Sequence, residues 1–363
     1  KPSDAEFVYF QEWTNPRCGI KSVSDNNDGT TSVSMSDYCW TQFLRKRYLE
    51  PKAPAYVENA YEFLDTQGEW YFNKDDRYIY YIPRDFEDMS KAAATVPTVE
   101  TLVSVNGTYS KPVKNITFKN LEFAYSTWLY PDTYGYSDAQ AGKLRDRLDE
   151  SGNGDDPCPD AAVEVTHAEN VNFEDCSFEK LGMSALSMLW GITDCRISGN
   201  SFGDISGSGI YLGTPYKDSA CTNWRNDICR NISIENNYFH DLALDYKSCV
   251  PISTIHMYDV SIKHNEIFNV PYSGIHGESG INTDRTGHIY SENFLNRVLN
   301  DVTYDGGSIY VTGKTGASAE PWNEIKGNYI KNQLNGYAGL YTDNKSSGWK
   351  LSDNVIDFSG VDK

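Results

Sequence analysis

Three carboxylic acids in the last third of this chain are placed where two of them could hydrolyse a glycosidic bond. Glu278 and Asp343 each end a short segment in which apolar and polar residues alternate, and Asp305 directly precedes two glycines. The reaction needs two carboxyl groups, roughly 5–5.5 Å apart when configuration is retained and roughly 6.5–9.5 Å apart when it is inverted. These three residues are therefore the candidate catalytic residues.

The segments that carry these residues limit how they can meet. If successive segments stack as strands, Glu278 and Asp343 share a column and lie two strand spacings, roughly 9–10 Å, apart. Asp305 lies at the other end of its segment, so a straight strand would keep it away from Asp343. Gly306-Gly307 permits a bend that brings it back. Each acid also has a structural alternative, because an Asp before Gly-Gly commonly forms a turn and the other two can end solvated loops.

A repeated pattern supplies those strands. Eight stretches alternate apolar and polar residues and end in Asn-x-aromatic or Asn-x-aliphatic, or a close variant: NITFKNLEF (115–123), NVNFEDCSF (170–178), DCRISGNSF (194–202), NISIENNYF (231–239), DVSIKHNEI (259–267), HIYSENFL (288–295), NEIKGNYI (323–330) and WKLSDNVI (349–356). Their alignment forms one column of Leu121, Cys176, Asn200, Asn237, Asn265, Asn293, Asn328 and Asn354. Period-2 alternation in repeats that vary by insertion predicts an all-β solenoid, a parallel β-helix. We expect the asparagines to form a structural ladder rather than to bind a ligand.

A second short strand follows each asparagine. Its aligned inward residues are Leu186, Ile210, Ile252, Ile275, Ile309 and Leu340. The next residues point outward: Ser187, Tyr211, Ser253, His276, Tyr310 and Tyr341. Two residues further on the same face come Leu189, Gly213, Ile255, Glu278, Thr312 and Asp343. The pattern predicts one exterior strip, on which Tyr211, Tyr310 and Tyr341 could stack on sugars and His276 or His256 could carry protons or bind sugar. Ordinary exterior side-chain ladders are the alternative.

Composition excludes several classes of function. With 39% hydrophobic and 23% charged residues the chain can bury a large core. The net charge of −19 argues against a nucleic-acid partner, and no apolar run approaches the roughly 18 residues of a membrane span. The sequence contains no evident metal-binding cluster of Asp, His or Cys, so we expect no metal or cofactor. The 26 tyrosines and 8 tryptophans, among them Trp128 and Trp224 as groove walls, suit neutral sugars.

Cysteines and glycosylation sequons indicate an extracellular protein. The chain has eight cysteines without a CxxC pair, which favours disulfides such as Cys18–Cys39 and Cys221–Cys229. Four N-x-S/T sequons begin at Asn106, Asn115, Asn231 and Asn344. The last of these adjoins Asp343, so a glycan there would crowd a substrate. Secretion as a glycoprotein is the resulting expectation.

The chain divides into an N-terminal β-rich extension (1–111) and the β-helix (112–363) with a long insertion at about 129–161. Within the extension, 29–35 alternates like a strand, 36–50 is a short helix or an irregular loop, and 68–84 is a hairpin of two aromatic strands. The first residue is a lysine in a polar run, which is typical of a mature chain or a fragment. Both ends of the solenoid look open, which would favour self-assembly by stacking.

Several phrases resemble bacterial secreted right-handed parallel β-helix repeat proteins, most closely glycoside hydrolase family 141. They are EWTNPRC (12–18), ENAYEFLDTQGEWYF (58–72), IYYIPRDFEDM (79–89), LEFAYSTWLYP (121–131), GYSDAQAG (135–142), NNYFHDL (236–242), YDGGSIYVTG (304–313) and GLYTDNKSS (339–347). The resemblance implies a right-handed helix with α-L-fucosidase or xylanase-type activity on glycans. It places the active site at the DGG and Y-x-D phrases, so Asp305 and Asp343 rank first and Glu278 is the alternative partner.

The combined prediction is a secreted carbohydrate-active β-helix protein that hydrolyses glycans or polysaccharides. The rival is a non-catalytic extracellular structural glycoprotein whose β-helices stack or cross-link into a fibre or coat. A third hypothesis is a carbohydrate-binding module that keeps the aromatic strip without the chemistry.

Overall fold

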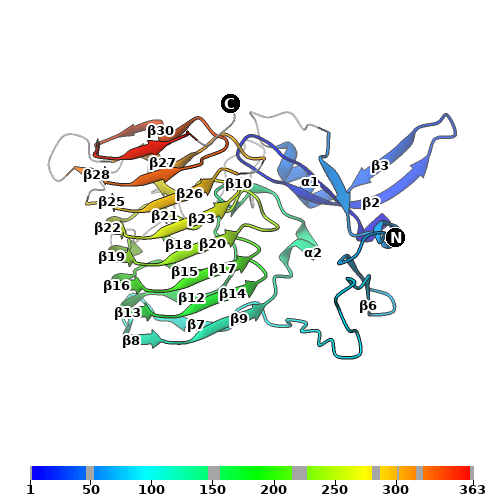
Figure 1. Ribbon diagram of the computed structural model, residues 1–363, viewed down its shortest axis with the longest axis horizontal. Coiled ribbons are helices and arrows are strands. Elements are labelled where there is room, and N and C mark those ends of the chain that lie inside the picture. The colour runs from blue at the N-terminus through cyan, green and yellow to red at the C-terminus, as the bar shows by residue number, and fades with distance from the viewer. Residues whose placement is uncertain are drawn as a thin grey trace.

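The computed structural model in Figure 1 describes residues 2–45, 53–145, 156–214, 227–279, 287–300, 302–315 and 322–359. Its larger part is a stack of coils, and the N-terminal residues form a separate lobe at one side of the stack (Figure 1). Within the described residues the coils form three parallel sheets of eight strands each. The fold is therefore the predicted parallel β-helix. No helix of the described residues is long and apolar enough to cross a membrane.

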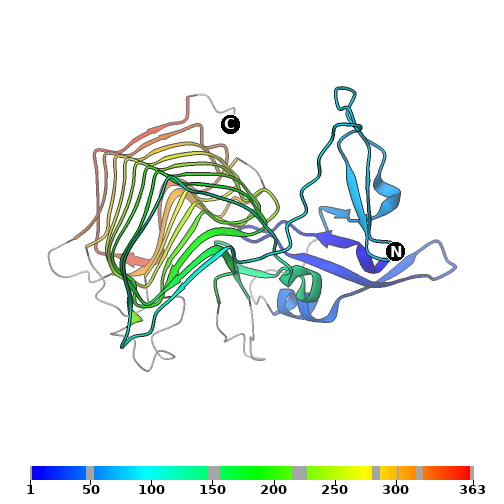
Figure 2. The same ribbon diagram turned by 90° about the horizontal axis from the view of Figure 1, so that it is seen from below.

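Each coil contributes one strand to each of the three sheets, and Figure 2 shows the coils superposed along the stack. Sheet 1 contains β7 (Val103–Asn106), β12 (Ala161–Thr166), β15 (Ser184–Leu189), β18 (Ile210–Gly213), β21 (Ile252–Ile255), β24 (Ile275–Glu278), β27 (Gly307–Lys314) and β30 (Ala338–Ser347). Sheet 2 contains β8 (Val113–Lys119), β13 (Ala168–Glu174), β16 (Thr193–Ser198), β19 (Arg230–Glu235), β22 (Tyr258–Lys263), β25 (Ile289–Ser291), β28 (Asn323–Lys326) and β31 (Trp349–Ser352). Sheet 3 contains β9 (Glu122–Ser126), β14 (Ser177–Leu181), β17 (Ser201–Ile205), β20 (Tyr238–Leu242), β23 (Glu266–Val270), β26 (Phe294–Val298), β29 (Tyr329–Lys331) and β32 (Val355–Asp357).

The repeated sequence pattern spans a corner between sheets 2 and 3, and not a single strand. The residue before the ladder column has a positive φ in all eight coils: Asn120, Asp175, Gly199, Asn236, His264, Glu292, Gly327 and Asp353. That left-handed conformation turns the chain sharply, and glycine, asparagine and aspartate adopt it at least cost. The predicted alternating segment is therefore two strands joined by a two-residue turn.

The asparagine ladder is confirmed by its hydrogen bonds. In Asn265, the side-chain Oδ1 accepts from the backbone N of Asn237 at 3.0 Å, and its Nδ2 donates to the Ile234 carbonyl at 2.9 Å. The same backbone bond to the next asparagine continues through Asn293, Asn328 and Asn354. These amides satisfy buried backbone groups at the corners, so they are structural.

The interior of the coils is closely packed. Four rings of sheet 3 stack in series, with centroids 4.8, 4.6 and 4.6 Å apart: Phe123, Phe178, Phe202 and Phe239. The predicted inward column of sheet 1 pairs in register, from Leu186 with Ile210 through to Ile309 with Leu340. Fully buried aromatic and aliphatic side chains of this kind contribute roughly 1.5–3 kcal/mol each.

The N-terminal lobe is antiparallel. It contains η1 (Pro2–Asp4), β1 (Glu6–Val8), β2 (Arg17–Asp25), β3 (Thr31–Met35), α1 (Asp37–Leu44), β4 (Tyr56–Glu58), η2 (Tyr61–Phe63), β5 (Trp70–Asn73) and β6 (Tyr78–Tyr81). The strand expected at 29–35 and the hairpin expected at 68–84 are confirmed by β3 and by the β5–β6 pair. The helix alternative for 36–50 is confirmed over the described residues by α1. Figure 2 shows this lobe projecting away from the coils.

The long insertion begins with α2 (Tyr130–Tyr134) and continues into β10 (Asp138–Gln140) and β11 (Lys143–Leu144). We call residues 138–144 the cover hairpin. Its two turn residues, Ala141 and Gly142, have φ values of 51° and 75°, which suits a two-residue hairpin turn. Residues 146–155 of the insertion lie outside the described residues.

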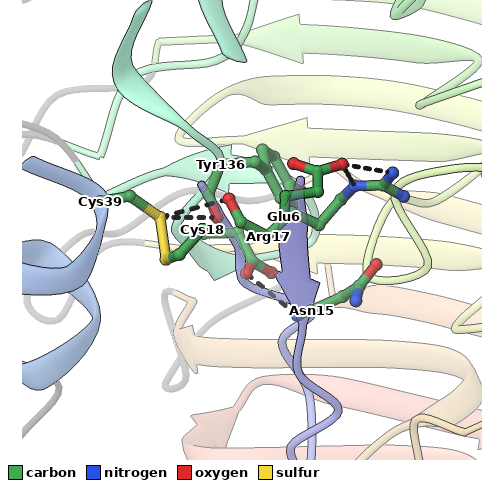
Figure 3. Close-up of a disulfide and its surroundings, with 7 residues drawn as sticks. Glu6, Asn15, Arg17, Cys18, Cys39 and Tyr136 are labelled. Atoms are coloured by element: carbon green, nitrogen blue, oxygen red, sulfur yellow. Dashed lines mark hydrogen bonds and ion pairs between the residues drawn. A yellow bond between two sulfur atoms is a disulfide. The ribbon is translucent and has the colours of Figure 1, made fainter. Parts of the chain in front are cut away.

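One disulfide forms within the described residues, between Cys18 and Cys39 (Figure 3), which confirms that predicted pairing. The other described cysteines are free thiols: Cys158, Cys176, Cys195, Cys229 and Cys249. The prediction of a disulfide for Cys229 was therefore wrong, and its expected partner Cys221 lies outside the described residues. Cys176 occupies the ladder column, and it and Cys195 are buried in the coil walls as small apolar side chains.

Candidate active site

The predicted exterior strip keeps its register on the outer face of sheet 1. Tyr211 pairs with Ser253, and His276 pairs with Tyr310, which pairs with Tyr341. Glu278 pairs with Thr312, and Thr312 pairs with Asp343. The column that should hold Glu278 and Asp343 two strands apart is therefore confirmed.

Most of this strip is covered, contrary to the expectation of an open surface. Tyr211 and His276 are fully buried. The Tyr211 hydroxyl donates to the Ala141 carbonyl at 2.8 Å, and a Cβ on Gly142 would collide with Cys249 and Tyr211. The cover hairpin thus seals the strip. Alternation along a strand fixes the face on which a side chain lies but not what packs on that face.

The strip opens only at its last coil, because Tyr310 in the coil before it is still buried. Gln140 at the end of β10 donates from Nε2 to the Tyr310 hydroxyl at 3.0 Å. Tyr310 donates in turn to Oδ2 of Asp343 at 2.7 Å, and Asn344 donates to the same oxygen at 3.1 Å. Asp343 and Tyr341 are half-buried. The cover hairpin and sheet 1 together hold the Asp343 carboxylate at the edge of the opening.

Asp305 lies in a sharp turn ahead of β27. Its backbone N donates to the Glu12 carbonyl at 2.9 Å, and its own carbonyl accepts from the Tyr272 hydroxyl at 2.8 Å. A Cβ on Gly306 would come within 2.7 Å of Tyr272, and one on Gly307 would come equally close to the Tyr341 Cβ. The two glycines are needed because the packing leaves no room for a side chain.

The two aspartates converge on Tyr341. Burial, together with the charges of Asp305 and Asp343, raises the pKa of Tyr341 to about 12. Burial and the hydrogen bond to Asp343 also raise the pKa of Tyr310. Both phenols therefore remain protonated at neutral pH, and Tyr310 stays a hydrogen-bond donor to Asp343.

A third carboxylate, Glu12, which was not among the candidates from the sequence, reaches this site from the N-terminal lobe. Burial and the nearby Glu12 carboxylate raise the pKa of Tyr304 to about 12. The Tyr304 ring packs edge-on against the exposed Tyr337, which packs against Tyr341. Glu12 and Gln140 both lie in phrases that carry the family resemblance (12–18 and 135–142), and that was the signal available for them.

Glu278 is engaged elsewhere. Its carboxylate forms an ion pair with the buried Lys143 of β11, and its Oε1 lies 3.9 Å from Nε2 of His256. Burial acts to raise the pKa of Glu278, but Lys143, His256 and His276 outweigh it and lower the pKa to about 2. A carboxyl group so strongly ionised cannot donate a proton at neutral pH. Its ion pair with Lys143 instead fixes the cover hairpin to sheet 1.

His276 gives the protein a measurable pH dependence. It stacks on Tyr310 with ring centroids 4.9 Å apart, and neither ring nitrogen has a hydrogen-bond partner among the described residues. Burial lowers the pKa of His276 to about 4. Between pH 6.5 and 4 the unfolded chain therefore binds a proton that the folded chain does not, so stability falls as pH falls. From pH 7 to 5 this loss is about 2 kcal/mol.

His276→Phe is expected to abolish that loss, because phenylalanine keeps the ring stack and cannot titrate. The measurement is urea unfolding at pH 7 and pH 5, a range above the one in which Glu278 titrates. An unchanged slope in His276→Phe would contradict the assignment.

The remaining sequence candidates lie around the site or away from it. The sequon residues Asn106, Asn115, Asn231 and Asn344 are all exposed. His256 is buried and bonds through Nδ1 to the Thr214 carbonyl at 3.0 Å. Trp128 is buried in a cluster with Tyr136 and Tyr246, whereas Trp224 lies outside the described residues. Among the described residues, no group of three or more His, Cys, Asp or Glu side chains is placed to hold a metal ion.

Comparisons with known proteins agree with this architecture. Residues 2–84 match the family model described as the GH141 insertion domain. A solved structure titled "Glycoside hydrolase" has a TM-score of 0.82 at 26% identity, over 99% of this chain and 67% of that chain. A second, "PfbA, a surface adhesin of Streptococcus pneumoniae", has a TM-score of 0.35 at 12% identity, over 74% of this chain and 77% of that one. No curated protein matches the sequence. The resemblance to glycoside hydrolase family 141 is confirmed: the chain is a parallel β-helix that carries the insertion domain of that family and is similar to a solved glycoside hydrolase.

Proposed function

We propose that this protein is a glycoside hydrolase in which Asp305 and Asp343 are the catalytic pair. One observation carries the proposal: at the opening of an otherwise covered strip, Tyr310 binds Asp343 at 2.7 Å, and the turn that holds Asp305 packs through Gly307 against the neighbouring Tyr341. Similarity to a solved glycoside hydrolase supports the reaction class. In this proposal the N-terminal extension (1–111) completes, through Glu12, a site that the β-helix (112–363) otherwise builds.

In the proposed reaction one carboxyl group protonates the glycosidic oxygen while the other attacks the anomeric carbon or activates a water molecule. Tyr310 holds the Asp343 carboxylate as a permanent hydrogen-bond donor, and the protonated Tyr341 lies beside both carboxylates. The ring of Tyr337, which is 64% exposed, offers a sugar its apolar face. Glu278, fixed by Lys143, keeps the cover hairpin in place and takes no direct part.

We infer further that the enzyme acts on glycans outside the cell. The Cys18–Cys39 disulfide suits an oxidising compartment, and the four exposed sequon asparagines are accessible to a glycosyltransferase. At Asn344 the nitrogen that would carry a glycan donates to Asp343. The active form is therefore expected to leave Asn344 unmodified, which peptide mass spectrometry of the expressed protein measures.

The test is turnover of a panel of aryl glycosides and plant polysaccharides by the wild-type protein and by the double variant Asp305→Asn, Asp343→Asn. We expect the wild type to release aglycone or reducing ends and the double variant, with the same circular dichroism spectrum and thermal midpoint, to release none. Equal turnover by both proteins would overturn the assignment of the pair.

The structural-glycoprotein alternative predicts a different set of results. It requires no turnover by folded wild-type protein on any substrate, a glycan on Asn344 and large assemblies in solution. Light scattering and mass spectrometry of the same preparation read out the last two. No turnover of any substrate in the panel, together with a glycan on Asn344 and large assemblies, would overturn the hydrolase proposal in favour of a stacking or cross-linked coat protein.

A further inference from the structure

A cavity of about 840 Å³ lies between the N-terminal lobe and the coils, away from the candidate active site. The lobe lines it with Phe63, Trp70 and Phe72, and the coil side lines it with Trp128 and Tyr246. None of the residues around Asp305 and Asp343 belongs to its lining. Cavities of this size at the junction of two structural units are common ligand sites.

The aromatic walls of the cavity expose ring surface to solvent. Trp70 is 66% exposed, and Phe63 and Phe72 are 45% and 42% exposed. On the opposite wall, the buried rings of Trp128 and Tyr246 meet edge to face, 5.1 Å apart. The exposed faces are unused by the fold and are suited to stacking on the apolar faces of sugar rings.

The charges of the cavity select against an anion. Six carboxylates line it: Asp4, Glu6, Glu58, Glu69, Asp132 and Asp245. The two cations of the lining are already paired, because Arg17 bonds to Glu6 and Glu58 and Lys74 pairs with Asp132 across the two walls. Carboxylates accept hydrogen bonds from sugar hydroxyls but repel uronates and sulfates. The preferred ligand is therefore polar and uncharged.

We propose that this cavity binds an uncharged stretch of an oligosaccharide chain. The identity of the ligand class rests on the proposed function, whereas the cavity, its aromatic walls and its charge do not. The site is distinct from the catalytic opening and would hold a glycan chain on the N-terminal lobe while a different part of it is cleaved.

One segment of the lobe touches both sites. Arg17 lines the cavity, and the backbone N of Asn15 donates to Oδ1 of Asp138 at 3.1 Å. The carbonyl of Glu12, in the same segment, accepts a hydrogen bond from the backbone N of Asp305. Residues 12–17 therefore fix the position of the cavity relative to the catalytic opening. A polymer that occupies both sites at once requires such a fixed geometry.

The experiment separates binding from hydrolysis by using the full chain with Asp305→Asn and Asp343→Asn. This protein is titrated by calorimetry with a set of uncharged plant oligosaccharides and with an oligogalacturonide as the charged comparison. Trp70→Ala in that background is expected to weaken binding of the best neutral ligand by about tenfold or more. Tyr78→Ala is the matched control, because Tyr78 is 67% exposed on the same hairpin but does not line the cavity.

Three outcomes would overturn the proposal: no binding of any neutral oligosaccharide, equal weakening by Trp70→Ala and Tyr78→Ala, or preference for the oligogalacturonide. In the catalytically intact chain, Trp70→Ala should raise KM for a polymer and leave hydrolysis of a small aryl glycoside unchanged. Binding without any hydrolysis by the wild type would refute the proposed function and retain this site. If the wild type hydrolyses the polymer and Trp70→Ala leaves KM unchanged, the proposed function is retained and this binding site is refuted.

Discussion

Asp343→Asn is expected to lower kcat for glycoside hydrolysis by about a thousandfold, because an amide can neither transfer a proton nor attack the anomeric carbon. Asparagine has the same shape and can still accept the hydrogen bond that Tyr310 donates at 2.7 Å, so the fold should be retained. The measurement is kcat and kcat/KM on the polysaccharide or oligosaccharide that the wild type turns over fastest, because its poor leaving group requires both carboxyl groups.

The matched control for that change is Asp357→Asn. Asp357 ends β32 on the neighbouring sheet and also accepts from a tyrosine, Tyr329, at 3.5 Å. This variant should keep wild-type kcat. If Asp343→Asn stayed within tenfold of the wild type while folded, Asp343 would be excluded as a catalytic residue.

Asp305→Asn should cause a loss of the same order, and the pattern of the two losses assigns the roles. The variant lacking the general acid retains activity on aryl glycosides with good leaving groups and loses the limb of the pH profile that reports the acid. The variant lacking the nucleophile or base loses activity on every substrate. The anomer released first, followed by NMR, then shows whether configuration is retained or inverted.

The architecture of the coils could be predicted because it depends on local rules. Period-2 alternation determined which residues of sheet 1 face inward, and all six aligned positions from Leu186 to Leu340 pair as expected. The corner turns follow from residues such as Asn236 and Gly199, which tolerate a positive φ. What alternation could not distinguish was one long strand from two strands joined at the asparagine.

The site itself depends on contacts between residues far apart in the chain, and these have no periodic signal. The strip on sheet 1 is buried because the cover hairpin, about 70 residues before Tyr211 in sequence, lies on it. Glu12 reaches Asp305 from the other end of the chain. Sequence reasoning could therefore name Asp305 and Asp343, through the resemblance, but not the segments that enclose them. Cys229 was misread for a related reason, because a buried thiol and a disulfide partner look alike in sequence, whereas the Cys18–Cys39 prediction was correct.

Lys143→Met should have the largest effect on stability, since it breaks the ion pair that fastens the cover hairpin to sheet 1. The Lys143 side chain is 5% exposed and that of Glu278 is 25% exposed, so the substitution leaves a carboxylate in the seam without its main partner. Breaking one side of a buried pair destabilises a protein by about 3–5 kcal/mol. Urea unfolding at pH 7 measures the loss, and Lys114→Met, at the exposed Lys114–Glu169 pair, should cost less than about 1 kcal/mol.

The double variant Lys143→Met, Glu278→Met decides what the pair does. If the loss in Lys143→Met comes from an unpaired buried charge, removing that charge as well should restore most of the stability, because apolar side chains can replace a buried pair with little penalty.

The pH dependence of the Lys143–Glu278 pair has a definite sign. The lowered pKa of Glu278, about 2, means that the pair stabilises the fold above about pH 4.5 and loses its effect as pH falls toward 2. The double variant should lose that dependence. Because the same hairpin carries Gln140, which binds Tyr310, Lys143→Met should also lower kcat where the double variant does not. A double variant as unstable as the single one would show that the hairpin is held by its packing and not by this ion pair.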